Sequence, residues 1–281
     1  MIAAYFASQG IGAGAYIASY YTTLFRDSKA SVVRSIGIVS TPILLILGLA
    51  FLVLDLGNPS HAFYVFSNPL SSVTSLGAIL LAISTIITGL QGIGVLARQK
   101  RLSDSALLML LGFIFAVMVA WYPGALLMDK EGIPFWTSPL LPVIFLLTAV
   151  YAGAGYLLLV YALLPSRLKQ QAERASAYRL LYLALGSAGV GLLLILAHVA
   201  LSLASPVEAC RLSAQYLTTG FFAAPFIALG VVLGTLCPIL LSWLSVRKKE
   251  VRSAYLALTG LLLICGAIVT RAGVLLVGVY G

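Results

Sequence analysis

An ionisable side chain ends one of the long apolar stretches of this sequence. Asp55 follows such a stretch and precedes Gly57 and Pro59, which stop a helix. A carboxylate at this depth in a membrane is costly to insert and is a functional candidate by default. Partial desolvation favours its protonated form, so Asp55 could take up or release a proton near neutral pH. The alternative is a solvated carboxylate at a helix end.

The two histidines of the sequence, His61 and His198, are the next candidates. Ligation of a b-type haem by two imidazoles needs histidines on facing helices at similar depth, and these two are the only pair available. Such a haem would require His61 to be held near a helix end. The alternative is an interfacial His61, which could contact a quinone, and a hydrogen-bonded His198 inside a helix bundle. We expect no haem in this chain.

Four residues could bind a quinone head group. Tyr122 precedes Pro123 inside an apolar stretch, where the proline kinks the helix and frees backbone carbonyls. A tyrosine at such a kink can donate a hydrogen bond to a quinone carbonyl, with Trp121 as a flat apolar wall. Ser8 and Gln9 in the first apolar stretch add hydrogen-bonding groups at the same level. Aromatic residues also anchor helices at membrane interfaces, and serines often serve packing alone, so both alternatives stay open.

Arg271 is the one basic residue deep inside an apolar stretch. An arginine there should face the interior of a helix bundle and meet a carboxylate, a carbonyl or a water-filled cavity. We expect a functional role, such as part of a proton path, or a structural ion pair, rather than a side chain that faces lipid. The sequence does not identify its partner.

A membrane protein must position these side chains. Of the 281 residues, 61% are hydrophobic and 9% are charged, against roughly 25% charged in ordinary soluble domains. The mean hydropathy is +1.08, so lipid must be the solvent for most of the protein. Cys210, Cys237 and Cys265 have no CxxC spacing, which argues against a disulfide framework, an iron–sulfur cluster or covalent haem. We expect no metal site.

The apolar stretches predict an all-α integral membrane protein with eight transmembrane helices in a single polytopic domain, residues 1–281. A bilayer needs about 20 apolar residues per helix, and the sequence divides at clusters of charge, Pro and turn residues. The predicted spans are residues 2–25, 35–54, 72–97, 105–128, 138–164, 180–204, 217–245 and 254–280. We expect two four-helix bundles. The closely spaced glycines Gly10, Gly12 and Gly14, and likewise Gly186, Gly189 and Gly191, predict faces where helices pack closely.

The basic residues predict the orientation of these spans. The sequence has 17 Lys and Arg against 8 Asp and Glu, a formal charge of +9, which in a soluble protein would suggest a nucleic-acid partner. Here 14 of the 17 fall in the first, third, fifth and seventh connections. By the positive-inside rule these connections are cytoplasmic and both termini lie outside, so we expect a multi-pass protein of the cytoplasmic membrane and no nucleic-acid partner.

Several motifs, taken in order, resemble the polysulfide reductase membrane-subunit family of the NrfD/PsrC type, which is related to the anchor subunits of dimethyl sulfoxide reductase. The resemblance covers essentially the whole sequence. Its motifs are residues 5–14 (YFASQGIGAG), 54–63 (LDLGNPSHAF), 68–77 (NPLSSVTSLG), 121–127 (WYPGALL), 134–142 (PFWTSPLLP) and 271–273 (RAG).

The resemblance implies a membrane anchor of an oxidoreductase complex. Its partners would be a four-cluster, ferredoxin-like iron–sulfur subunit and a molybdopterin catalytic subunit on the outer face. Electrons would pass between menaquinol, or another quinone, and the nearest cluster, and proton transfer could accompany them. The resemblance makes Asp55 a proton-handling group, Tyr122 a quinone partner, and Ser8 and Gln9 pocket lining. Related anchors carry a histidine in place of Asp55, and the family's first helix often carries one near Ser8 and Gln9.

A secondary transporter or proton-conducting channel is the alternative function. The proline-broken spans and Arg271 would suit such a protein, although the sequence shows no convincing internal repeat. Whether this protein is itself an enzyme is open, because the terminal substrate would be reduced or oxidised on another subunit.

Overall fold

The secondary structure is helical, with no strand, in the part of the protein that the structure describes, as predicted. The computed structural model describes residues 2–25, 32–55, 73–130, 132–169, 171–248 and 252–280, which contain no strand. The elements are α1 (Ile2–Thr23), α2 (Val32–Asp55), α3 (Val73–Leu96), α4 (Lys100–Ser103), α5 (Ala106–Met128), α6 (Leu140–Leu163), the 3₁₀ turn η3 (Ser166–Leu168), α7 (Gln171–Leu203), α8 (Glu208–Thr218), α9 (Ala223–Pro225), the π-helix η4 (Phe226–Leu236), α10 (Cys237–Lys248) and α11 (Ser253–Tyr280).

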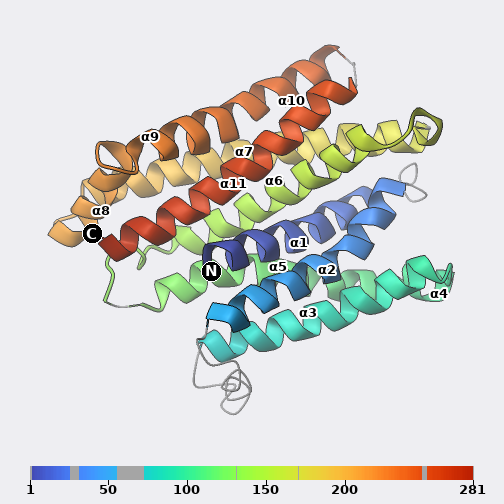
Figure 1. Ribbon diagram of the computed structural model, residues 1–281, viewed down its shortest axis with the longest axis horizontal. Helices are drawn as coiled ribbons and strands as arrows, with labels where there is room; N and C mark the ends of the chain where they lie inside the picture. The colour runs from blue at the N-terminus through green and yellow to red at the C-terminus, as the bar shows by residue number, and fades with distance from the viewer. Residues whose placement is uncertain are drawn as a thin grey trace.

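The long helices run side by side along the longest axis of the molecule (Figure 1). One end, which we call the terminal end, carries the start of α1, the end of α11, the connection 129–139 and α8. The other end carries α4, η3, the end of α10 and the start of α11, and we call it the basic end. Its described basic residues are Arg34, Arg98, Lys100, Arg101, Arg167, Lys169, Arg174, Arg179, Arg247, Lys248 and Arg252. Arg26, Lys29 and Lys249 lie outside the described residues.

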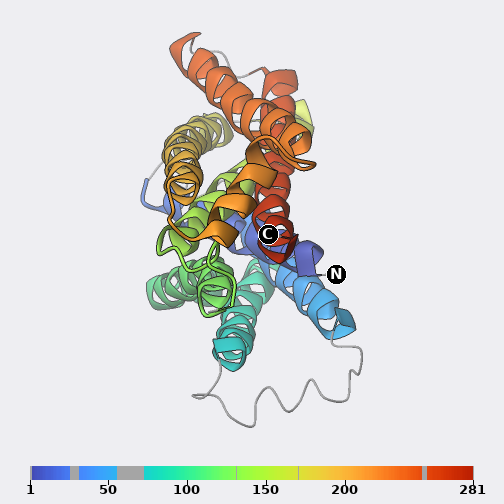
Figure 2. The same cartoon turned by 90° about the vertical axis from the view of Figure 1, so that its left-hand side faces the viewer.

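The helices form two sets that meet along α1 and α6. In the first set, α1 and α3 each pack against both α2 and α5. In the second, α6 packs against α7 and α11, while η4 and α10 lie along α11. Figure 2, which looks from the terminal end, shows the two sets one above the other. α1 crosses between the sets, because it contacts α6 and α11 as well as its own partners.

Seven helices within the described residues are long and apolar enough to cross a membrane, where the sequence predicted eight. α1 is the predicted span that is not among them. It is a 22-residue helix, but Gly, Ser, Gln, Thr and Tyr dilute its apolar residues, and most of its side chains are buried. α2, α5, α6 and α11 surround it, so its surface meets protein instead of lipid and does not need to be strongly apolar.

Small residues let the central helices approach closely. A Cβ placed on Gly14 would overlap the backbone of Ala149, and one on Gly153 would overlap the backbone of α1, so α1 and α6 touch through main chain. The glycines of the first span therefore pack helices, as predicted. The same prediction is wrong for Gly186 and Gly189, where a Cβ would meet nothing within 4 Å, because these residues lie on the outer side of α7.

Two elements differ from the predicted spans for physical reasons. α7 begins at Gln171 instead of residue 180, although its first turns are charged. Glu173 is 2% exposed and accepts hydrogen bonds from the backbone N–H groups of Val32 and Val33, so it caps α2. The seventh span contains the π-helix η4, whose extra residue per turn is accommodated where the Thr235 hydroxyl donates to the Gly230 carbonyl, at 2.8 Å.

Candidate functional site

An apolar cavity of about 570 Å³ opens at the terminal end. Its walls come from the first turns of α1, the last turn of α5, the connection 129–136 and the end of α11. Its apolar lining includes Phe6, Leu126, Trp136 and Leu275, and Asp129 also lines it. The Trp136 indole N–H donates to the Val274 carbonyl at 2.9 Å, which fixes this wall to α11.

A polar cluster lies next to this cavity and consists of Tyr5 and Gln9 of α1 and Tyr122 of α5. Leu126 lines the cavity, and Tyr122 lies one helical turn before it on the same face of α5. The Gln9 amide of α1 donates to the Val119 carbonyl of α5 at 2.8 Å, which joins the two helices. The Gln9 Oε1 atom is buried and has no hydrogen-bond partner among the described residues. The cluster therefore offers an acceptor that bonds to nothing within the described protein.

Tyr122 is buried at 5% exposure between α5 and α3. Its hydroxyl lies 3.5 Å from the Thr74 carbonyl, the outer limit for a hydrogen bond, so this contact leaves it largely available to another acceptor. Gly77 of α3 makes room for the ring, because a Cβ there would overlap it. The sequence predicted a role for Tyr122 from its proline neighbour, and the structure shows the space that accommodates it.

Tyr5 belongs to this cluster and was missed in the sequence. It is 2% exposed and lies within electrostatic range of Tyr122. Its place in the cluster could have been predicted from its spacing, because Tyr5 and Gln9 are four residues apart and share one face of α1. Ser8 is buried nearby, but its hydroxyl donates back to the carbonyls of Ala4 and Tyr5 in its own helix. Ser8 lines the packing surface against α2 and is already satisfied.

Arg271 lies on the other side of α1, beneath the cavity. It is 3% exposed, and one helical turn separates it from Leu275 in the cavity wall. Its guanidinium donates to the backbone carbonyls of Phe6 in α1 and Phe145 in α6, the second at 2.6 Å, and to the Thr148 hydroxyl at 2.9 Å. None of the described residues gives it a carboxylate partner. It thus clamps α1, α6 and α11 together through neutral groups.

The remaining predicted site residues fall outside the cluster or outside the described residues. Trp121 is 43% exposed on the outer side of α5 and does not share the surroundings of Tyr122. Asp55 ends α2 at the terminal end, but its side chain is not among the described ones. His61 lies outside the described residues, so its role stays a prediction.

His198 and the cysteines show no sign of a metal centre. His198 is 1% exposed in α7, packs against the Phe135 ring at 4.7 Å between centroids, and has no hydrogen-bond partner for Nε2 among the described residues. The structure forms no group of three or more His, Cys, Asp or Glu side chains that could hold a metal ion, as far as its described residues extend. Cys210, Cys237 and Cys265 are unpaired.

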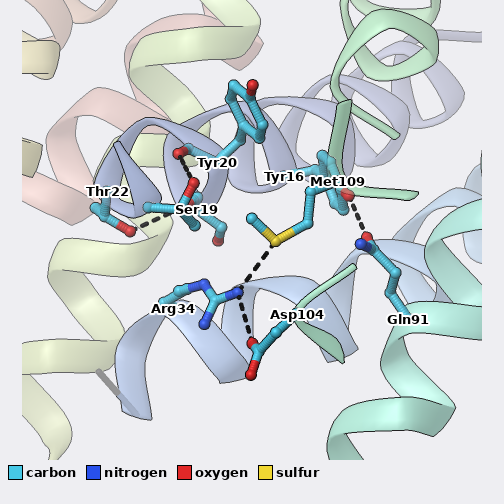
Figure 3. A network of polar contacts seen from close by, with 9 residues as sticks. Tyr16, Ser19, Tyr20, Thr22, Arg34, Gln91, Asp104 and Met109 are labelled. Atoms are coloured by element: carbon cyan, nitrogen blue, oxygen red, sulfur yellow. Dashed lines mark hydrogen bonds and ion pairs between the residues drawn. The ribbon is translucent and has the colours of Figure 1, made fainter. Parts of the chain in front are cut away.

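A second polar network occupies the basic half of the first helix set (Figure 3). The Tyr16 hydroxyl of α1 donates to the Gln91 side chain of α3. Nearby, Arg34 of α2 reaches Asp104 and the Met109 sulfur, at 3.4 and 3.3 Å. The predictions from sequence missed this network. The signal available was a lone glutamine inside an apolar span, since such residues usually bond to a neighbouring helix.

Two comparisons with known proteins find a match. The family model described as "Polysulphide reductase, NrfD" matches residues 1–280. The C subunit of polysulfide reductase from Wolinella succinogenes is 28% identical over 180 residues, which cover 57% of the present protein. The match spans 56% of that relative, so the two proteins align over about half of its length.

Proposed function

The protein belongs to the NrfD polysulphide reductase family and is a multi-pass membrane protein, and from this premise we propose that it is the quinone-reactive membrane subunit of a molybdopterin and iron–sulfur oxidoreductase. It passes electrons between menaquinol and an iron–sulfur subunit at the terminal end. The observation that carries the proposal is the polar cluster beneath an apolar cavity, at the end of the molecule opposite most of the basic residues.

The residues of this site fit a quinol. A quinol needs a partner for each ring oxygen and an apolar slot, and the cavity of about 570 Å³ is wide enough for an aromatic ring system. The unpartnered Gln9 Oε1 can accept from a quinol hydroxyl, and the Tyr122 hydroxyl can donate to a quinone carbonyl. Bound menaquinol would supply the two electrons and two protons of the reaction.

The protein's own residues hold and orient the ring. Gln9 is fixed by its bond to the Val119 carbonyl, so its free oxygen points in a set direction. Arg271 fixes the Phe6 carbonyl and with it the part of α1 that lines the cavity. We assign Asp55 as the group that receives the proton, because it ends α2 at the same end of the molecule. His61 and Trp121 remain proposed contacts of the quinone, and Ser8 remains proposed lining.

The partner subunits dock at the terminal end in this proposal. The basic residues gather at the other end, which the positive-inside rule places in the cytoplasm. The eighth span is then α1, which protein surrounds on most sides. The terminal end faces outward from the cytoplasmic membrane, where the iron–sulfur and molybdopterin subunits receive electrons over a short distance.

The proposal is tested by the composition and the turnover of the purified complex. Affinity purification of this protein should bring with it a four-cluster iron–sulfur subunit and a molybdopterin subunit. Tyr122→Phe and Asp55→Asn should each lower menaquinol oxidation by about tenfold or more, since donor and proton-transfer groups typically contribute that much. Assembly should stay intact in both variants.

A third variant is Trp121→Phe, which changes the residue next in sequence to Tyr122 but on the exposed side of α5. Its effect on quinol oxidation reports directly on the proposed Trp121 contact and should be smaller than that of Tyr122→Phe. Full quinol turnover in both Tyr122→Phe and Asp55→Asn would refute the site. Solute uptake by proteoliposomes that contain this protein alone would refute the function itself.

A further inference from the structure

A small pocket lies between α10 and α11 at the basic end, far from the quinone site. Its volume is about 190 Å³, and its lining residues are Leu241, Leu244, Ser245, Lys248 and Tyr255. The pocket is apolar toward the middle of the helices and ends in an ammonium group at their tips. Neither the family nor the proposed quinone chemistry assigns a role to it.

Cations and aromatic rings surround the mouth of this pocket. Arg252 lies over the Tyr255 ring at 5.9 Å, and Arg247 lies over Trp243 at 5.1 Å. Together with Lys248, the described residues of this region supply three cations. Aromatic residues with neighbouring cations mark the level of lipid headgroups in membrane proteins. The pocket therefore lies at the membrane interface.

Lys248 lines the pocket, and Arg252 lies over the Tyr255 ring that also lines it, so the mouth of the pocket carries positive charge. A negatively charged ligand is the charge complement of this site.

The helix surface below the pocket is suited to acyl chains. Leu240 and Leu244 of α10 are 59% and 41% exposed, and Leu258 and Leu261 of α11 are 45% and 50% exposed. These side chains continue inward from the pocket along both helices. A ligand with a phosphate at one end and hydrocarbon at the other fits the cationic mouth and the exposed leucines beside it. A free anion would contact only the mouth.

We propose that the pocket between α10 and α11 binds an anionic phospholipid of the cytoplasmic leaflet, with its phosphate against Lys248 and Arg252 and its acyl chains on the exposed leucines. Basic pockets between transmembrane helices on the cytoplasmic side recognise such headgroups. The bound lipid would hold the second helix set in the bilayer at the end opposite the quinone site. The inference does not depend on quinone reactivity.

Lipid retention by the purified full-length protein tests this proposal. Native mass spectrometry should show retained phosphatidylglycerol and much less phosphatidylcholine with the same acyl chains. The double variant Lys248→Gln with Arg252→Gln should weaken phosphatidylglycerol binding about tenfold or more. The matched control, Lys100→Gln with Arg101→Gln, removes the same charge from α4 at the same end and should bind lipid as the wild type does.

Each remaining outcome decides the question. Lys248→Arg should keep the lipid, which separates loss of charge from misfolding. Equal losses in the two double variants would show a diffuse electrostatic effect and overturn the pocket. Equal binding of phosphatidylcholine would show that the net negative charge of the headgroup does not matter, and would overturn the proposal. Thermal protection by inorganic phosphate alone, equal to that by the lipid, would overturn the assignment to a phospholipid.

Discussion

Two arginines are buried in the described part of this protein, and the protein treats them differently at its two ends. Arg34, at the basic end, is 7% exposed and pairs at 3.4 Å with Asp104, whose side chain is 55% exposed (Figure 3). Arg271, beneath the terminal-end cavity, is 3% exposed and bonds to two carbonyls and a hydroxyl on other helices. Arg34 pairs with a carboxylate that water reaches, whereas Arg271 depends on backbone carbonyls and a hydroxyl.

The difference shows what each charge does. Water and salt reach the carboxylate of the Arg34 pair, and this screening weakens the attraction between the two charges. A guanidinium without water must satisfy its donors within the protein, and Arg271 does so by joining three helices. In a membrane, apolar burial does not drive helix association, so close packing and bonds between helices hold the bundle together. Arg271 therefore holds the floor of the proposed quinone site.

Replacement of Arg271 should have the largest effect. Arg271→Gln removes three charge-assisted hydrogen bonds and leaves an amide too short to replace them, which should cost about 3 kcal/mol of stability. The melting temperature of the purified protein should fall, and quinol oxidation should fall with it, because the Phe6 region of α1 loses its fixed position. A melting temperature equal to the wild type's would refute the clamp.

A change at Gly10 sharpens the same comparison with an intermediate effect. A Cβ at this position would overlap the Arg271 guanidinium, so Gly10→Ala should cost roughly 1–3 kcal/mol by overpacking. In an Arg271→Gln background the same alanine should cost much less, because the obstructing group is gone. The control is Gly186→Ala, where a Cβ meets nothing within 4 Å and stability should not fall. Additive costs in the double variant would contradict the contact.

Replacement of Arg34 should have the smallest effect. Arg34→Gln removes the pair with the exposed Asp104 and the contact to the Met109 sulfur, so the melting temperature should fall by the equivalent of roughly 1–2 kcal/mol, less than for Arg271→Gln. Added salt should weaken the wild-type pair and bring the two proteins closer. A loss as large as that of Arg271→Gln would remove the distinction between the two ends.

The sequence predicted the helices well because lipid imposes a simple rule on them. Long apolar stretches and basic connections located the spans, and the resemblance to the NrfD family is confirmed by the match over residues 1–280. The rule failed for helices that are surrounded by protein instead of by lipid or water. α1 is too polar to count as a span by hydropathy, and the charged start of α7 is helical because Glu173 bonds to α2. Neither the packing around α1 nor the bonds of Glu173 can be read from the composition of the sequence.

The site was predictable in part. Tyr122 and Gln9 stood out as polar groups in apolar helices, and the structure bonds Gln9 to Val119, about one turn before Tyr122 on α5. The partners of Arg271 were out of reach, since backbone carbonyls carry no sequence signal. The position of Trp121 was equally hidden, because neighbours on a helix point about 100° apart and only the packing decides which one is buried.

The most direct test of the account is the position at which a quinone binds. A photoreactive menaquinone analogue should be cross-linked to the purified complex, and the labelled peptides of this protein mapped by mass spectrometry. The account predicts adducts in residues 2–9 of α1 and 122–128 of α5, which excess menaquinol removes and Tyr122→Phe weakens. Competable adducts confined to α7, α10 or the basic end would contradict it.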